Sequence, residues 1–112
     1  SLGDLSGKQV CKIVAKELSD LYHTTVRPRQ VEKAMESFLT EHEYDSRTVF
    51  DAEFEDVEIN VYGGRRVGLK GTLHLREGAI NDFYSYGREQ VSLIFVFNAD
   101  LNEVNVRSTR LM

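Results

Sequence analysis

The chain has 112 residues, of which 41% are hydrophobic and 29% charged, a composition typical of one globular domain over residues 1–112 and not of a disordered or fibrous chain. Its 18 acidic and 14 basic residues give a formal net charge of −4, which argues against nucleic-acid and membrane-surface proteins because both bind through positive potential. The single cysteine rules out an internal disulfide, and no apolar run approaches the about 18 residues of a membrane span. We therefore expect a soluble, cytoplasmic protein with no membrane partner. Because the chain begins Ser-Leu-Gly without an initiator methionine, we also expect it to be trimmed or excised from a longer protein.

The first predicted helix covers residues 6–22. Ser6 and Gln9 have the spacing of a capping box, in which each side chain bonds the backbone N–H of the other residue. Apolar residues then recur at helical spacing. They are Val10, Ile13, Val14, Leu18, Leu21 and Tyr22.

The second predicted helix covers about residues 28–43. Pro28 suits the first helical turn, where its missing N–H is not needed. An apolar stripe follows, and Glu32 and Glu36 fall outside it. The connection between the helices is about five residues long, which predicts that they lie side by side and roughly antiparallel.

Beyond the second helix the apolar residues alternate with the period of two that is typical of strands. We predict strands over about 47–61, 66–76, 79–86, 90–97 and 103–110.

The first of these strands changes phase along its length. Phe50 and Phe54 share one phase, whereas Val57 and Ile59 share the other. A strand switches faces only where an extra residue is inserted, so Glu55-Asp56 is predicted to form a β-bulge.

The position of Asp82 depends on a predicted two-residue turn at Glu77-Gly78. In that register Leu73 pairs with Asp82, and the carboxylate lies on the core face. A partly desolvated carboxylate with tyrosine hydroxyls beside it could serve as a general acid or base. A one-residue slip would instead place Asp82 opposite His74 on the outer surface, and in a third arrangement Asp82 ends the hairpin at a sheet edge. The candidate catalytic residues are therefore Asp82 and His74, and the candidate ligand-binding residues are Tyr62, Asp82, Tyr84 and Tyr86.

The order of two helices and then strands lacks β-α-β alternation, which predicts an α+β fold. We expect an N-terminal helical hairpin packed on one face of a curved antiparallel β-meander of four to five strands. Residues 91–97 are apolar at odd and even positions alike, so that strand is expected to be buried on both faces. The second face then needs a cover, which would be sheet curvature, the C-terminal segment or a partner subunit. Its candidate interface residues are Phe83, Ile94 and Val96.

The remaining polar candidates have ordinary explanations. Arg65 and Arg66 follow two glycines, but a strand rather than a helix comes next, so they form a basic hairpin tip and not a phosphate-binding loop. Cys11 is expected to be a small buried hydrophobe. The three histidines are not at metal-ligand spacing, so we predict neither a metal nor a cofactor.

Three functions remain open on these grounds. The favoured one is a non-enzymatic protein-interaction or regulatory domain that binds a protein partner or forms a homodimer through the sheet. The alternative is a small-molecule pocket or enzyme between the helices and the concave sheet, using Asp82 and the nearby tyrosines. The third, which the net charge disfavours, is nucleic-acid binding through the arginine-bearing hairpin tips.

Overall fold

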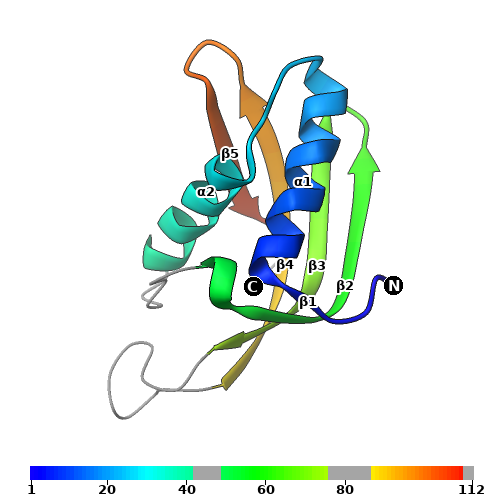
Figure 1. Cartoon of the computed structure of the whole chain (residues 1–112), viewed down its shortest axis with the longest axis vertical. Helices are drawn as coiled ribbons and strands as arrows, with labels where there is room; N and C mark the ends of the chain where they lie inside the picture. The colour runs from blue at the N-terminus through cyan, green and yellow to red at the C-terminus, as the bar shows by residue number, and fades with distance from the viewer. Residues whose placement is uncertain (42–48, 76–86, 110–112) are drawn as a thin grey trace.

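The computed structural model describes residues 1–41, 49–75 and 87–109. Two helices, α1 (Gly7–Tyr22) and α2 (Pro28–Glu41), lie on one face of an antiparallel sheet (Figure 1). The sheet contains five strands in the order of the chain. They are β1 (Leu5–Ser6), β2 (Glu53–Tyr62), β3 (Arg66–Leu75), β4 (Gly87–Asn98) and β5 (Glu103–Ser108). The predicted α+β class, a helical hairpin followed by an antiparallel meander, is confirmed.

The start of α1 is held by the predicted capping box. Gln9 N donates to Ser6 Oγ at 3.2 Å, and Ser6 N donates to Gln9 Oε1 at 2.9 Å. The helix ends at His23, whose backbone is left-handed with φ 52°. Its buried face consists of Val10, Cys11, Val14, Ala15 and Leu18.

One polar side chain organises the connection between the helices. Ser19 Oγ donates to Ala15 O at 2.7 Å and accepts from Val26 N at 2.9 Å, so the chain after α1 is turned back toward α2. The buried stripe of α2 then contains Val31, Ala34, Met35 and Leu39. Glu32 joins this stripe with only 4% of its surface exposed, although the sequence pattern placed it outside.

A short 3-10 helix, η1 (Val49–Asp51), stands where the sequence predicted the beginning of the strand over 47–61. The strand begins only at Glu53, so the prediction was wrong for this part. Phe50 and Ala52 alternate as strand residues do, but Ala52 N donates to Val49 O within the segment at 3.0 Å, and further hydrogen bonds join the segment to the helices.

The helices supply these partners from two sides. Val49 N donates to Glu36 Oε2 at 3.2 Å, and Phe50 N donates to Glu32 Oε2 at 3.0 Å. From α1, Gly7 N donates to the carbonyl oxygen that follows η1, at 2.8 Å. Because backbone N–H groups inside a fold need acceptors, the carboxylates of the buried Glu32 and the half-buried Glu36 stabilise the 3-10 turn.

The predicted bulge in β2 is confirmed. The register with β3 shifts between Glu55 and Glu58, and Asp56 has a left-handed backbone with φ 53°. The extra residue lets Phe54 and Val57 both point into the core, where they are 1% and 0% exposed.

The N-terminal segment covers the neighbouring edge of β2. Leu5 of β1 pairs with Phe54, and farther out Leu2 N donates to Val57 O at 2.8 Å while Val57 N donates to Gly3 O at 2.9 Å. The sequence did not predict this short strand, because two residues are too few to show a period.

The ladder between β3 and β4 corrects the predicted strand pairing. It runs from Val67 opposite Phe95 to Leu75 opposite Gly87, so β3 pairs with β4 and not with a strand at 79–86 joined by a tight turn. β4 also begins earlier than predicted. The ladder brings the inward apolar residues of the two strands together, with Val67 opposite Phe95 and Leu69 opposite Leu93.

Both predicted pairings of Asp82 are therefore wrong. Leu73 lies opposite Glu89, and His74 lies opposite Arg88. The first pairing assumed a two-residue turn at Glu77-Gly78 and the second a turn that also includes Ala79, and these turn residues lie outside the described residues. Asp82 itself lies outside the described residues.

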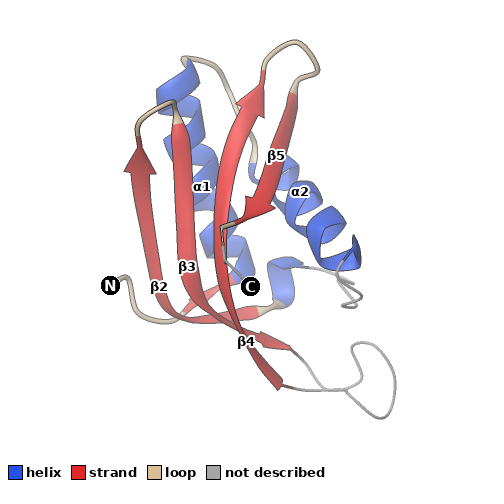
Figure 2. Ribbon diagram, turned by 180° about the vertical axis from the view of Figure 1, so that it is seen from behind, coloured by secondary structure: helices blue, strands red, loops and turns tan. Residues whose placement is uncertain are grey.

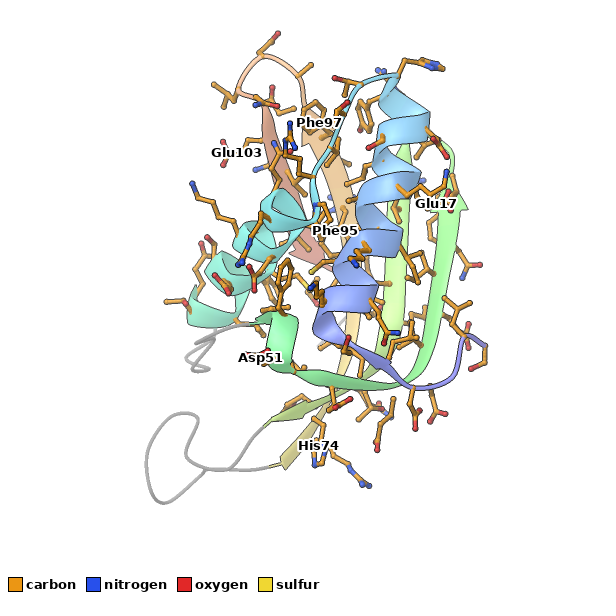
Figure 3. All side chains as sticks on the ribbon, viewed as in Figure 1. Glu17, Asp51, His74, Phe95, Phe97 and Glu103 are labelled. Carbon is orange, nitrogen blue, oxygen red and sulfur yellow. The ribbon has the colours of Figure 1, made fainter. Side chains whose placement is uncertain are left out.

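The core fills the space between the helices and the inner face of the sheet. Phe95 and Phe97 of β4 point toward the helices (Figure 3) and are 0% and 7% exposed. Elements from α1 to β5 contribute to the same cluster, with Leu18, Met35, Phe54, Val67, Leu69, Leu93 and Val104 among its members. Because the odd residues of β4 face the helices, its even residues face the other way.

Candidate functional site

We call the sheet face that points away from α1 and α2 the outer face. Figure 2 shows this face toward the viewer, with both helices behind the strands. The strand register brings alternate side chains to it. They are Glu53, Glu55, Glu58, Asn60, Tyr62, Arg66, Gly68, Lys70, Thr72, His74, Arg88, Gln90, Ser92, Ile94, Val96, Glu103, Asn105 and Arg107.

A hollow of about 270 Å³ lies near the centre of the outer face. Gly68 lines it, and the ring of Tyr62 lies against this glycine: a Cβ on Gly68 would be 2.5 Å from Tyr62 Cε2. Ile94 also lines the hollow and is only 8% exposed, whereas Tyr62 keeps 40% of its surface exposed. The rest of the lining consists of Leu69 and Leu93 and of the polar residues Arg66, Lys70, Ser92, Arg107 and Thr109.

Charge is divided across the outer face. β2 carries the acids Glu53, Glu55 and Glu58, whereas Lys70 and Arg107 lie on β3 and β5. One ion pair crosses the divide at the lower end of the sheet, where Arg88 Nε lies 3.5 Å from Glu55 Oε1. The face is therefore acidic along one side and mainly basic from its centre outward, with Glu103 an acid at the far end of β5.

Of the predicted ligand-binding and catalytic residues, the structure describes Tyr62 and His74, and these two lie far apart. Tyr62 lies opposite Arg66 at one end of β3, and His74 is exposed near the other end (Figure 3). Eight strand residues separate these positions on β3, or about 27 Å. The remaining candidates, Asp82, Phe83, Tyr84 and Tyr86, lie outside the described residues.

The predicted interface residues of β4 do lie together on the outer face. Ile94 and Val96 both point away from the helices, as the alternation of the strand predicted. Ile94 is buried and Val96 is half-buried, without a second layer of described structure over them. The neighbouring side chains of the outer face therefore supply part of the cover that the two-sided strand requires.

The arginines of the hairpin tip are held against the fold. The Arg65 guanidinium lies 4.8 Å from the centre of the Tyr22 ring, and Tyr22 Oη donates to Arg65 O at 2.9 Å. Arg66 Nε donates to Gly63 O at 2.6 Å within the turn. Both guanidinium groups thus have partners in the hairpin and α1.

Two neighbouring acids on α2, the buried Glu32 and the half-buried Glu36, were not predicted from the sequence as candidate site residues. Glu32 accepts from Arg29 Nη1 at 2.8 Å as well as from η1, and Glu36 lies one turn farther along. Burial raises the pKa of Glu36, the bond from Val49 N–H lowers it, and the neighbouring Glu32 raises it again. The only signal in the sequence was the spacing of two glutamates beside an apolar stripe.

Cys11 belongs to the same region. Its side chain is 0% exposed, and its pKa is raised to about 12, first by burial and then by the charges of Glu32 and Glu36. A thiol with so high a pKa is a poor nucleophile, and the prediction of a small buried hydrophobe is confirmed. Both carboxylates already accept hydrogen bonds from η1, so this cluster has a structural explanation.

Metal sites, membrane spans and similarity to known proteins were also considered. Within residues 1–41, 49–75 and 87–109, no group of three or more His, Cys, Asp or Glu side chains could hold a metal ion. In the same ranges no helix is long and apolar enough to cross a membrane. No protein-family model, curated protein or solved structure matches the chain with significance.

Proposed function

We propose that this chain is a non-enzymatic protein-interaction domain that self-associates, with the outer face of one copy packed on the outer face of a second. The observation that carries the proposal is the division of charge across that face. Acids line β2, and Arg107 lies on β5 at the opposite side of the sheet.

In a dimer with its two-fold axis parallel to the strands, the acidic side of each outer face lies against the basic side of the other. Such an axis places β2 of one copy over β5 of the other and keeps each position along the strands at the same height. Across the sheet Glu58 is paired with Lys70, which is paired with Ser92, whereas Arg107 is paired with Ile94, two residues farther along β4. In the dimer Glu58 of each copy therefore lies near Arg107 of the other. The contact occurs twice in a two-fold dimer, which doubles its effect.

The centre of the same face supplies apolar area. Tyr62 and Ile94 line the hollow at Gly68, where a side chain of the second copy can enter, and Val96 lies beyond Ile94 on the same face of β4. Most of the rim is polar, so we expect an interface of moderate affinity that weakens with salt.

Charge reversal tests the proposal. Glu58→Arg places like charges together twice per dimer and should raise the dimer Kd by about tenfold. Arg107→Glu should have a similar effect, and the double variant Glu58→Arg with Arg107→Glu should restore the wild-type value because the pair is then inverted. Size-exclusion chromatography with light scattering over a concentration series measures each Kd.

Lys12→Glu is the matched control, because it reverses one exposed charge on α1, away from the outer face. It should leave the dimer Kd unchanged. A strictly monomeric wild-type chain at every concentration, or a double variant weaker than both single variants, would contradict self-association through this face.

A further inference from the structure

The hollow on the outer face is lined by three cations. They are Arg66 and Lys70 from β3 and Arg107 from β5. None of the described residues that line the hollow is acidic, although the chain as a whole carries a formal net charge of −4. This concentration of positive charge favours an anion at the centre of the sheet.

Two of these cations are available to a ligand. Within residues 1–41, 49–75 and 87–109 neither Lys70 nor Arg107 forms an ion pair, although Glu58 is the cross-strand neighbour of Lys70. Ser92 lies opposite Lys70 in the ladder, and its Oγ is 2.5 Å from Thr109 Oγ1. Both hydroxyls line the hollow together with the two cations. An anion here would therefore meet two charged donors and a hydroxyl donor.

The same hollow offers aromatic and apolar surface. The ring of Tyr62 lies against Gly68, and the 40% exposure of this tyrosine leaves part of the ring open to a ligand. Ile94 lies opposite Gly68 on β4 and adds an aliphatic side chain to the lining. Because aromatic rings stack on tyrosine and pack against aliphatic side chains, this part of the hollow favours a flat apolar group.

We propose that the hollow binds a small aromatic carboxylate, with its ring against Tyr62 and Ile94 and its carboxylate between Lys70 and Arg107. A carboxylate has two oxygens, one for each cation. The volume of about 270 Å³ is just below the range of about 300–1,000 Å³ found for ligand pockets, so the ligand has one or two rings. Arg66 Nε already donates to Gly63 O, so this guanidinium adds positive potential at the rim.

Ligand binding does not rest on self-association, but the two use the same surface. A bound carboxylate and Glu58 of a second copy would both contact Arg107, and the ring of the ligand would fill the hollow that a side chain of the second copy enters. The ligand and the second copy therefore exclude each other. Where a dimer forms, saturating ligand should raise the dimer Kd.

The test uses 2-naphthoate in a nuclear magnetic resonance titration of the full chain labelled with nitrogen-15. We expect saturable shifts of the backbone amides of Gly68, Ser92 and Arg107 with a Kd of about 1 mM. The neutral analogue 2-naphthamide should bind about fivefold more weakly, because it keeps the rings but lacks the charge. Because Glu58→Gln weakens the proposed dimer contact, the same titration on this variant tests the hollow in the monomer.

Protein variants separate the roles of charge and ring. Lys70→Gln and Arg107→Gln should each weaken 2-naphthoate binding by about fivefold and leave 2-naphthamide binding unchanged, because only a charge is removed. Tyr62→Leu should weaken the binding of both ligands, since it removes the aromatic surface and no charge. Lys12→Gln is the matched control: this exposed lysine of α1 is away from the outer face, and its loss should change neither affinity.

Several outcomes would overturn the ligand site. They are equal affinity for 2-naphthoate and 2-naphthamide, shifts confined to residues away from the hollow, and no saturation on either wild-type or Glu58→Gln protein at about ten times the expected Kd. A strictly monomeric chain that binds 2-naphthoate in the hollow would contradict only self-association. A dimer that 2-naphthoate neither binds nor dissociates would contradict only the ligand site.

Discussion

Glu32 and Glu36 are unusual among the charged residues of this chain because the fold uses them as backbone acceptors. Their carboxylates receive the first N–H groups of η1, at 3.0 Å from Phe50 and 3.2 Å from Val49. Burial and mutual repulsion disfavour the doubly charged pair, so the pKa of Glu36 is raised. A carboxyl whose folded-state pKa exceeds its unfolded value binds a proton more tightly in the folded protein, and its contribution to stability is lost as the pH rises.

Glu36→Gln should therefore change how stability depends on pH. The wild-type contribution is complete below the ordinary value of 4.5 and declines as the pH rises through the higher folded-state pKa. Glutamine cannot ionise, and its carbonyl oxygen can still accept from Val49 N, so the variant should gain stability relative to wild type between pH 4 and pH 7. Urea denaturation at both pH values measures the difference. Glu17→Gln on α1, away from η1 (Figure 3), serves as the control. A Glu36→Gln effect of equal size at both pH values would contradict the assignment.

The junction of α1 with η1 depends on one small residue. Gly7 is the first residue of α1, and its N–H donates across to the segment after η1 at 2.8 Å. A Cβ at this position would lie 1.6 Å from Val49 O and 2.7 Å from Val49 C, which are backbone atoms that cannot rotate away. The close approach lets Gly7 N–H reach Ala52 O, directly before the start of β2.

Gly7→Ala should consequently destabilise the chain by about 2–3 kcal/mol, although alanine is the better helix former, because the backbone of η1 must move. Denaturation in urea followed by circular dichroism gives the value. Gly63→Ala is the matched control: a Cβ there meets nothing within 4 Å, and we expect a change within about 0.5 kcal/mol. A Gly7→Ala variant as stable as wild type would mean that η1 is not held against α1.

Helices and sheet share one core. Buried residues of α1, α2, η1 and every strand from β2 to β5 belong to one cluster, and Cys11 lies within it at 0% exposure. No element among the described residues has a separate core on which it could remain folded alone, so we expect the chain to unfold in a single cooperative transition.

Cys11 offers a direct measurement of this cooperativity. It is the only cysteine, and burial raises its pKa to about 12, so thiol reagents should modify it only after the helices leave the sheet. Its labelling by a disulfide reagent should follow the same urea dependence as the far-ultraviolet circular dichroism signal. Leu101→Cys in a Cys11→Ala background, at a position 67% exposed, should react immediately. Rapid labelling of Cys11 with an unchanged spectrum would show that α1 opens separately.

Features governed by neighbouring residues could be predicted from the sequence. The capping box of Ser6 and Gln9, the start of α2 at Pro28 and the bulge before Val57 each follow from short-range hydrogen bonding or from a change of period. The outward direction of Ile94 and Val96 followed from the alternation of a single strand. The part of the outer face contributed by β4 was therefore anticipated, although the hollow at Gly68 was not.

Features that depend on a choice between distant partners were decided only in three dimensions. By its sequence pattern Leu73 could pair with a nearby strand or with one farther along the chain, and in the folded chain it lies opposite Glu89 of β4. Phe50 belongs to an apolar alternation that is typical of strands. Its N–H nevertheless donates to Glu32 on α2, and the segment is a 3-10 helix. The hollow at Gly68 likewise combines residues of β2, β3, β4 and β5, which only the folded sheet brings together. Amino-acid patterns indicate which face of a helix or strand is apolar. Which element covers that face depends on the total buried area and the hydrogen bonding of the whole folded chain.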